Sequence, residues 1–355
     1  MRLAHRLGIH REQNLRNKTI FAAEMSRRLW WQIYLLNRHY VNLCEDIDSS
    51  DPAHILIFNT KRPLNLNDAD LHPEMTTMPL ERDGVTEMLF CSIRYDIGSF
   101  VRELSSGSDN QQNKIHAIQQ LQARLEDRYA RHCDASIPLQ CVSRCLIKTT
   151  GYRLALRHCH SIEDATENQP GTERHQAFDT ALLLLQTQHS SCASQILDRY
   201  KWHTKLFYCF EALFPVLHTL AFGVISEASS EQAWQQVELA YRYNPELLES
   251  QHKNFYPSYC HNINSLALKA WSRKASTAEH MPNFLQQIQI QQNRVVGQEV
   301  VESMNTSIPQ IANLVPEGLT SNHQLFNFNL DTSENGGQTW EYWLNTFDNA
   351  ELLGI

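Results

Sequence analysis

Cysteine and histidine are the residues of this chain whose types could bind a metal ion. Cys141 and Cys145 are four residues apart, so a helix would place both thiols on one face. The other candidates lie nearby in the sequence: Cys133, His158, Cys159 and His160. A structural zinc site usually shows two pairs of closely spaced ligands, and this repeat is absent. We therefore interpret these cysteines as core thiols and predict no metal ligand.

The sequence also lacks complete calcium-binding, nucleophile, phosphate-binding and zinc-protease motifs. Asp46, Asp48 and Asp51 resemble the start of a calcium loop, but Asp51 takes the glycine position and Ile57 takes the place of the bidentate glutamate. The chain has no nucleophile elbow, no phosphate-binding glycine loop and no zinc-protease motif. Its seventeen histidines offer no basis for choosing a general base. We predict no catalytic residue and no cofactor, and cofactor-binding residues stay unknown.

Composition favours a helical protein with little affinity for DNA. The 355 residues include only twelve glycines and twelve prolines, fewer than strand-rich folds need for their turns. The net charge is −8, and no run of five or more basic residues occurs. Such a chain neutralises few phosphates, so we expect weak or no direct DNA binding by this chain alone. The nine cysteines and the lack of an export signal indicate reduced thiols in cytosol or nucleus.

One apolar segment, from Leu206 to Ile225, is about as long as a bilayer is thick. Glu211, Pro215 and His218 interrupt it, and its aromatic residues recur at helical spacing. A carboxylate in lipid is costly. We therefore expect a buried central helix and no membrane contact.

The clearest helix is expected from about Thr19 to Leu43, followed by a long loop from Asp46 to Pro79. Its apolar face is marked by Phe21, Met25, Leu29, Ile33, Leu36 and Tyr40. Glu24 and Arg28 lie four residues apart, which predicts an exposed ion pair.

Helical patterning resumes at about Gly84, with one apolar stripe over Met88–Leu89, Ser92–Ile93, Asp96–Ile97 and Phe100–Val101. The next helix places inward Ile115, Ile118, Leu121, Leu125 and Tyr129, and pairs Asp127 with Arg131. Further helices are predicted near Cys141–Ser161, Phe178–Tyr200, Trp202–Ile225, Glu231–Tyr243 and Tyr256–Ala275. Thr166–Gly171 is expected to be a linker, and Ser229–Ser230 a helix cap.

The composition changes again from about Gln286. The segment from Asn327 to Ile355 has no lysine or arginine, and it spaces aromatic and leucine residues between acids. This is the composition of acidic activation segments, whose charge keeps apolar side chains available to a partner. The alternative is a helix docked on the body through Trp340, Trp343 and Phe347.

Two blocks give the chain a family resemblance. Leu7–Glu12 reads Leu-Gly-Ile-His-Arg-Glu, and Glu24–Trp31 reads Glu-Met-Ser-Arg-Arg-Leu-Trp-Trp. The later segment Pro63–Leu71 reads Pro-Leu-Asn-Leu-Asn-Asp-Ala-Asp-Leu, and Gly84–Asp96 follows it. Over about residues 1–100 these blocks resemble the fungal-specific transcription factor domain, the helical middle region of fungal zinc-cluster regulators. The six-cysteine zinc cluster of that family is not present here, because the first cysteine is Cys44.

The resembling residues also have a physical interpretation. Trp30 and Trp31 point to different helix faces, so one can anchor the core while the other packs against the following loop. Arg27 and Arg28 could pair with the loop acids Asp68 and Asp70. We interpret these residues as an element that holds the fold and not as a binding site.

Together these observations predict an all-α protein. Residues 1–285 would form an irregular multi-helical regulatory domain that lacks the family's earlier helices, and residues 286–355 a low-periodicity segment with an acidic, aromatic tail. The resemblance implies a nuclear transcriptional regulator, not an enzyme, that controls a secondary-metabolite gene cluster. Its expected partners are the transcription machinery or another DNA-binding subunit, with a small-molecule effector as an open option. The alternative is an α-helical enzyme or binding protein for a hydrophobic metabolite, with a pocket lined by Phe207–Phe222.

Overall fold

The computed structural model describes residues 1–43, 58–105, 111–159, 170–248, 257–274 and 281–293. Within these ranges the chain is helical and contains no strand, which confirms the predicted all-α class. The α-helices are α1 Arg2–Arg6, α2 Glu12–Leu15, α3 Ile20–Leu43, α4 Leu89–Ser105, α5 Gln111–Arg128, α6 Pro138–Cys159, α7 Pro170–Ala193, α8 Lys201–Leu206, α9 Leu213–Phe222, α10 Glu227–Tyr243 and α11 Pro257–Lys274. Short 3-10 turns are η1 Asp68–Asp70, η2 Ala130–His132, η4 Gln195–Tyr200, η5 Phe210–Ala212 and η6 Pro245–Leu248.

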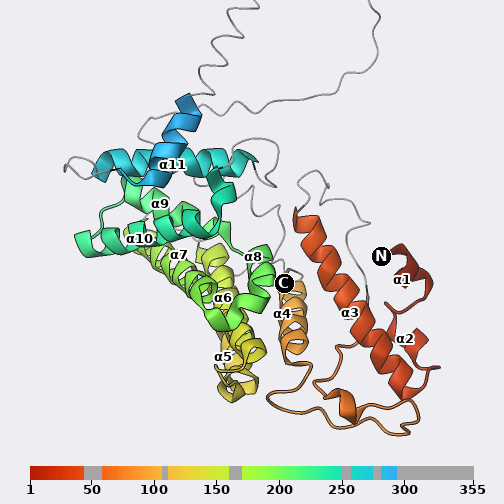
Figure 1. The fold of residues 1–355 in the computed structure, drawn as a ribbon. Helices are drawn as coiled ribbons and strands as arrows, with labels where there is room; N and C mark the ends of the chain where they lie inside the picture. Colours follow the sequence, from red (N-terminus) through yellow and green to blue (C-terminus); the bar gives the residue numbers. More distant parts are fainter. Residues whose placement is uncertain (44–57, 106–110, 160–169, 249–256, 275–280, 294–355) are drawn as a thin grey trace, which may run out of the picture.

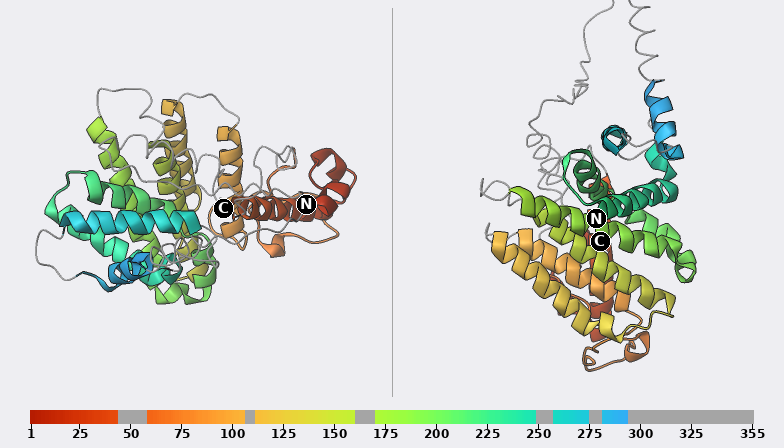
Figure 2. Two further views of the ribbon diagram at one scale, coloured as in Figure 1. Left: turned by 90° about the horizontal axis from the view of Figure 1, so that it is seen from above. Right: turned by 90° about the vertical axis from the view of Figure 1, so that its left-hand side faces the viewer.

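Figure 1 shows α4 between two differently built parts of the molecule. On one side lie α1, α2 and α3 with the irregular residues 58–87. On the other side lie α5 to α11, and the two views of Figure 2 show these helices stacked in crossing layers. Within them α6 packs along α7, and α9 packs against α7, α10 and α11.

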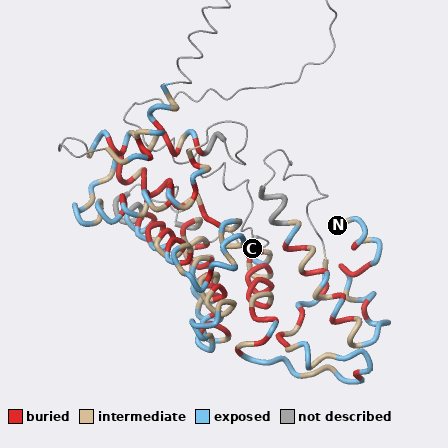
Figure 3. Tube along the Cα trace, in the orientation of Figure 1, coloured by how far each residue is buried: buried red, intermediate tan, exposed pale blue. Residues whose placement is uncertain are grey.

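The largest apolar cluster surrounds α9, where Leu213, Val216 and Leu217 are completely buried. Residues 283–293 are also helical, and Leu285 and Ile288 join the same cluster. A second cluster lies between α4, α5 and α6, and a third between α3 and α4. Figure 3 shows these buried faces as continuous red stretches, clearest along α4.

The apolar stripes predicted for α4 and α5 are confirmed. Leu89, Ile93 and Ile97 are buried on α4, and the predicted inward residues of α5 from Ile118 onward are buried too. Asp127 also pairs with Arg131 as expected. The helix begins at Leu89, however, and not at Gly84. Gly84 has φ of +83°, a left-handed conformation in which a helix cannot begin, and the Thr86 hydroxyl accepts the Met88 N–H.

The predicted helix over Trp202–Ile225 is wrong, because the chain breaks between α8 and α9. The flanking segments Gln195–Lys205 and Phe210–Phe222 meet at 94°. Pro215 has no N–H to donate to the carbonyl of residue 211, so it fits only in the first turn of a helix. Accordingly, α9 begins at Leu213 and Pro215 lies in its first turn.

Three smaller expectations need correction. The cap of α10 is Ser226, whose hydroxyl accepts the Ser229 N–H, so the helix begins earlier than the predicted Ser229–Ser230 cap. Pro170 and Gly171 open α7 and are not linker, because proline suits the first helical position. The predicted helix Phe178–Tyr200 ends at Ala193 and continues as η4. The acidic segment Asp46–Asp51, whose resemblance to a calcium loop the sequence already argued against, and the tail Asn327–Ile355 lie outside the described residues.

Among the described residues no single helix is long and apolar enough to cross a bilayer. The bent pair around α8 and α9 meets the length and composition criteria only when its two segments are taken together.

Candidate functional site: the paired-tryptophan helix and its loop

The two tryptophans of α3 are both buried in one cluster. Trp30 is 0% exposed, and its ring centroid lies 5.3 Å from that of Phe58. Trp31 lies 5.4 Å from the same phenylalanine, and its indole N–H donates to the Lys61 carbonyl over 2.9 Å. Trp31 therefore contacts the following loop as predicted. Both indoles contact Phe58, but their other ring partners differ: Trp30 packs against His5 and His10, and Trp31 against Tyr34 and Tyr95.

The buried face of α3 is not the predicted one. Met25, Leu29 and Leu36 are 42%, 51% and 60% exposed. The buried residues are instead the two tryptophans with Tyr34 and Leu35, which meet Met88 and Tyr95 of α4. This helix carries apolar residues on two sides, and the aromatic side is the larger, so it excludes more water when it packs.

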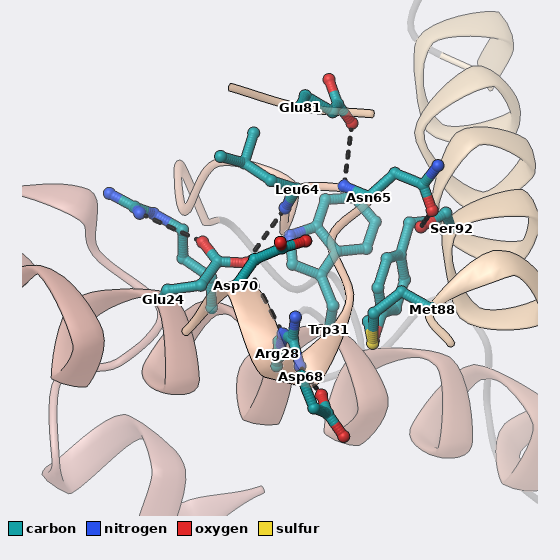
Figure 4. Close-up of polar contacts among 12 residues, drawn as sticks. Glu24, Arg28, Trp31, Leu64, Asn65, Asp68, Asp70, Glu81, Met88 and Ser92 are labelled. Carbon is teal, nitrogen blue, oxygen red and sulfur yellow. Dashed lines mark hydrogen bonds and ion pairs between the residues drawn. The ribbon is translucent and has the colours of Figure 1, made fainter. Parts of the chain in front are cut away.

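Glu24 is the buried acid that joins α3 to the loop. Its Oε1 accepts the Leu64 N–H over 3.0 Å and lies 3.7 Å from the Arg28 Nε, while its Oε2 lies 3.4 Å from the Arg27 Nη1. Figure 4 shows this carboxylate between Arg28 and Leu64. Burial raises the pKa of Glu24, against the opposing effect of the Leu64 N–H and the two arginines. The predicted pair with Arg28 exists, but it is buried and not exposed.

Arg27 pairs with Glu12 and not with the loop acids. Its Nη2 and Nε reach the two Glu12 oxygens at 2.5 and 3.3 Å. The same carboxylate accepts the Lys61 N–H over 3.0 Å. Burial acts to raise the pKa of Glu12, but these hydrogen bonds outweigh it and lower the pKa. Glu12 lies on α2. The partner of Arg27 therefore comes from the segment before α3 and not, as predicted, from the loop.

The loop acids take one predicted and one unpredicted partner. Arg28 Nη1 lies 3.0 Å from Asp68 Oδ1, as expected. Asp70 instead binds Arg82 through both oxygens, at 2.5 and 2.7 Å, and accepts the Asn67 N–H over 3.0 Å. Asp70 therefore closes η1 within the loop and does not reach α3.

Asn65 organises the next part of the loop, and sequence reasoning missed it. Its side-chain amide donates to the carbonyls of Arg82 and Gly84, over 2.9 and 3.0 Å. Its oxygen accepts from the Thr86 hydroxyl over 2.5 Å and from the Ser92 hydroxyl of α4 over 3.3 Å. Figure 4 shows Asn65 reaching toward Ser92, with Glu81 accepting its backbone N–H. The only signal was an asparagine-rich loop between prolines.

A buried acid on α4 binds the loop from the other side. Asp96 accepts the Tyr129 hydroxyl over 2.9 Å and forms ion pairs with Arg62 and Arg128. Arg128 also reaches Glu81 over 2.6 Å. We call the polar residues of this network the polar clamp: Glu12, Glu24, Arg27, Arg28, Asn65 and Asp96. Each clamp carboxylate is bonded to a guanidinium as well as to another donor, and for Glu12 and Glu24 that donor is a backbone N–H of the loop.

The candidate metal ligands do not converge in the described residues. No group of three or more histidine, cysteine or acidic side chains there could hold a metal ion. The Cys133 thiol donates to the Tyr129 carbonyl over 3.3 Å, and Cys141 and Cys145 are half-buried on α6. Burial raises the pKa of Cys133 and Cys141, which disfavours the thiolate that binds metal. The side chains of residues 158–160 lie outside the description.

Curated relatives support the resemblance seen in the sequence. The aurofusarin cluster transcription factor aurR2 of Gibberella zeae is 27% identical over 78% of this chain. The pyriculol/pyriculariol biosynthesis cluster transcription factor 1 of Pyricularia oryzae is 26% identical over 89% of it. The C6 finger domain transcription factor nscR of Aspergillus fumigatus is 26% identical over 68% of it.

The similarity covers 42%, 44% and 32% of the lengths of these three relatives, so the chain spans less than half of each. No family model matches the chain, and no solved structure matches it. The predicted resemblance to fungal zinc-cluster regulators of secondary-metabolite clusters is nevertheless confirmed by these relatives.

Proposed function

We propose that this chain is the regulatory part of a fungal zinc-cluster transcription factor that controls one biosynthetic gene cluster. The observation that carries the proposal is the similarity along more than two thirds of the chain to regulators named for such clusters. An all-helical body whose family-like residues hold a loop in place agrees with a regulatory scaffold. It would act in the nucleus and have no catalytic role.

The body would span about residues 1–285, with the tail from residue 286 as the segment that contacts the transcription machinery. The acids and aromatics of Asn327–Ile355 support this role by composition. The net charge of −8 supports weak or no DNA binding by this chain alone, with DNA contact left to a zinc cluster or a DNA-binding subunit.

The rival reading, a pocket for a hydrophobic metabolite lined by Phe207–Phe222, gains no support from α9. Leu213, Val216 and Leu217 have no exposed surface, and Phe214 packs in the same cluster. These side chains form core contacts with α7, α10 and α11.

The test is deletion of the gene in its own organism, followed by transcript profiling. We expect the transcripts of one contiguous set of biosynthetic genes to fall at least tenfold, and the wild-type gene to restore them. A Trp340→Ala, Trp343→Ala variant should restore them poorly while the protein accumulates normally. Unchanged transcripts in all biosynthetic clusters after deletion would contradict the proposal.

A further inference from the structure

Arg94 is a buried arginine of α4 for which the described residues supply no counter-ion. It is 8% exposed. No described carboxylate lies within ion-pair distance of its guanidinium, and no described group accepts a hydrogen bond from it. Burial lowers its pKa, as expected for a cation that no neighbouring acid offsets.

Other buried or half-buried arginines of this protein differ from Arg94 in this respect. Arg28 pairs with Glu24, Arg128 with Asp96, and Arg157 with Glu211. An unpaired buried charge is costly, and proteins retain one chiefly where a ligand or partner completes it. Arg94 is therefore a buried cation to which an external anion could bind without displacing an acid of the described residues.

Two aromatic rings lie within cation–π distance of this guanidinium, and two further aromatic side chains pack next to them. Its carbon lies 5.8 Å from the Phe90 ring of α4 and 5.9 Å from the Phe207 ring, which follows α8. The His203 ring of α8 lies 5.2 Å from Phe90 and 4.5 Å from Phe207. Trp202, 66% exposed, packs edge-on against His203 at the solvent side. The cation therefore lies among flat apolar surfaces that can contact a planar ligand.

We propose that Arg94, Phe90, His203 and Phe207 form a binding site for a small aromatic carboxylic acid. The guanidinium would bind the carboxylate with two parallel hydrogen bonds, and the rings would pack against the aromatic body. This inference rests on the proposed function, because it gives the regulator an effector of stated chemistry.

The place of the site suggests how binding would be transmitted. Arg94 neighbours Tyr95, whose hydroxyl accepts a hydrogen bond from Gln32 of α3. Asp96, the next residue, belongs to the polar clamp. On its other side the site uses α8, which contacts α7 of the bundle. A ligand there would fix α4 against α8 and so couple the two parts of the molecule.

The test uses the purified full chain with 2-naphthoate as the probe, in calorimetric titration and thermal melting. We expect saturable binding and a rise in Tm with naphthoate concentration. The neutral analogue 2-naphthalenemethanol should give no rise, and acetate, which lacks the rings, a much smaller one. Absence of saturable naphthoate binding to the wild type would overturn the proposal.

The variant Arg94→Met distinguishes an arginine that binds the ligand from one that only stabilises the fold. It should weaken naphthoate binding about tenfold to a hundredfold. Its own Tm should equal or exceed that of the wild type, because an unpaired buried charge is removed. The matched control Arg157→Met leaves Glu211 with a weaker partner, so it should lower the Tm and leave naphthoate affinity unchanged. Undiminished binding to Arg94→Met would overturn the proposal.

If Arg94→Met does not fold, the variant Arg94→Lys tests the site instead. Lysine keeps the positive charge but cannot form the two parallel hydrogen bonds to a carboxylate. Weaker binding to this variant at wild-type Tm supports the site, and unchanged binding refutes it. The titration is independent of gene control: unchanged transcripts after deletion would remove the regulator role and leave the binding curve intact.

Discussion

Residues 58–87 and the helices around α9 are both packed on their neighbours, but different interactions hold them. The loop has little regular structure beyond η1, so its backbone groups need side-chain partners: Glu24 for Leu64, Glu12 for Lys61 and Glu81 for Asn65. Around α9 the helices satisfy their own backbone, and Leu213, Val216 and Leu217 supply apolar contact.

The difference explains where the recognisable residues lie. A carboxylate that must accept one particular N–H has few substitutes, whereas a packed apolar position tolerates several side chains of similar volume. The first part of the chain therefore carries residue-specific blocks such as Glu24–Trp31, and the second part carries only a helical pattern. Variants that remove one contact in each part measure this contrast.

The largest expected effect is that of Glu24→Ala. It leaves the Leu64 N–H without its acceptor and two largely buried arginines without their shared acid, so the free energy of unfolding should fall by about 3–5 kcal/mol. Urea unfolding followed by circular dichroism measures this. Even Glu24→Gln should be destabilising, because its amide would direct N–H groups at Arg27 or Arg28. A loss below 1 kcal/mol for both variants would show that the clamp does not hold the loop.

Leu217→Ala should cost about 3 kcal/mol through the cavity that it leaves in the α9 cluster. Leu217→Met should cost less than about 1.5 kcal/mol, since methionine has similar volume and adapts to its neighbours. The same urea titrations apply. Equal losses for the two variants would mean that this cluster is as residue-specific as the clamp.

The stabilisation that Glu211 provides inside the bundle should depend on pH. Arg157 and Arg153 outweigh the effect of burial and lower its pKa to about 2, from an ordinary value of 4.5. Its stabilisation is therefore present at neutral pH and is lost as the pH falls from 4.5 toward about 2. Glu211→Gln should cost about 2 kcal/mol at pH 7 and little near pH 2. Thermal melts at both pH values check this; a difference that grows toward acid would reverse the sign.

The smallest effect is expected on the exposed side of α3. Leu29→Gln should change stability by less than about 0.5 kcal/mol, because half of Leu29 is already in water. Leu35→Gln, on the buried side of the same helix, should cost several times more. Similar losses for the two variants would mean that the predicted face also packs against part of the molecule.

How well the buried face of a helix could be predicted from the sequence differs between α4 and α5 on one hand and α3 on the other. The α4 and α5 stripes were predictable because their polar and apolar residues separate at helical spacing. On α3 they do not separate, since Met25, Leu29 and Leu36 form as regular a row as Trp31, Tyr34 and Leu35. Periodicity alone could not show which row meets α4, because that choice depends on the rest of the fold.

The candidate site was predictable only in part. The pairing of Arg28 with Asp68 followed from opposite charges in two blocks that had to meet. The partner of Arg27 was missed because Glu12 lies in a different segment, and the role of Asn65 was missed because its four contacts come from residues 82–92. Such contacts depend on three-dimensional folding, and no spacing within one helix encodes them.

If Glu24 and its neighbours hold the loop on α3, amide hydrogen exchange of the Glu24→Ala variant should show the loop released. We predict that residues 58–71 exchange much faster than in the wild type, while α7, α9 and α11 keep their protection. Unchanged exchange in residues 58–71, or an equal rise in the loop and in these three helices, would show that Glu24 does not hold the loop.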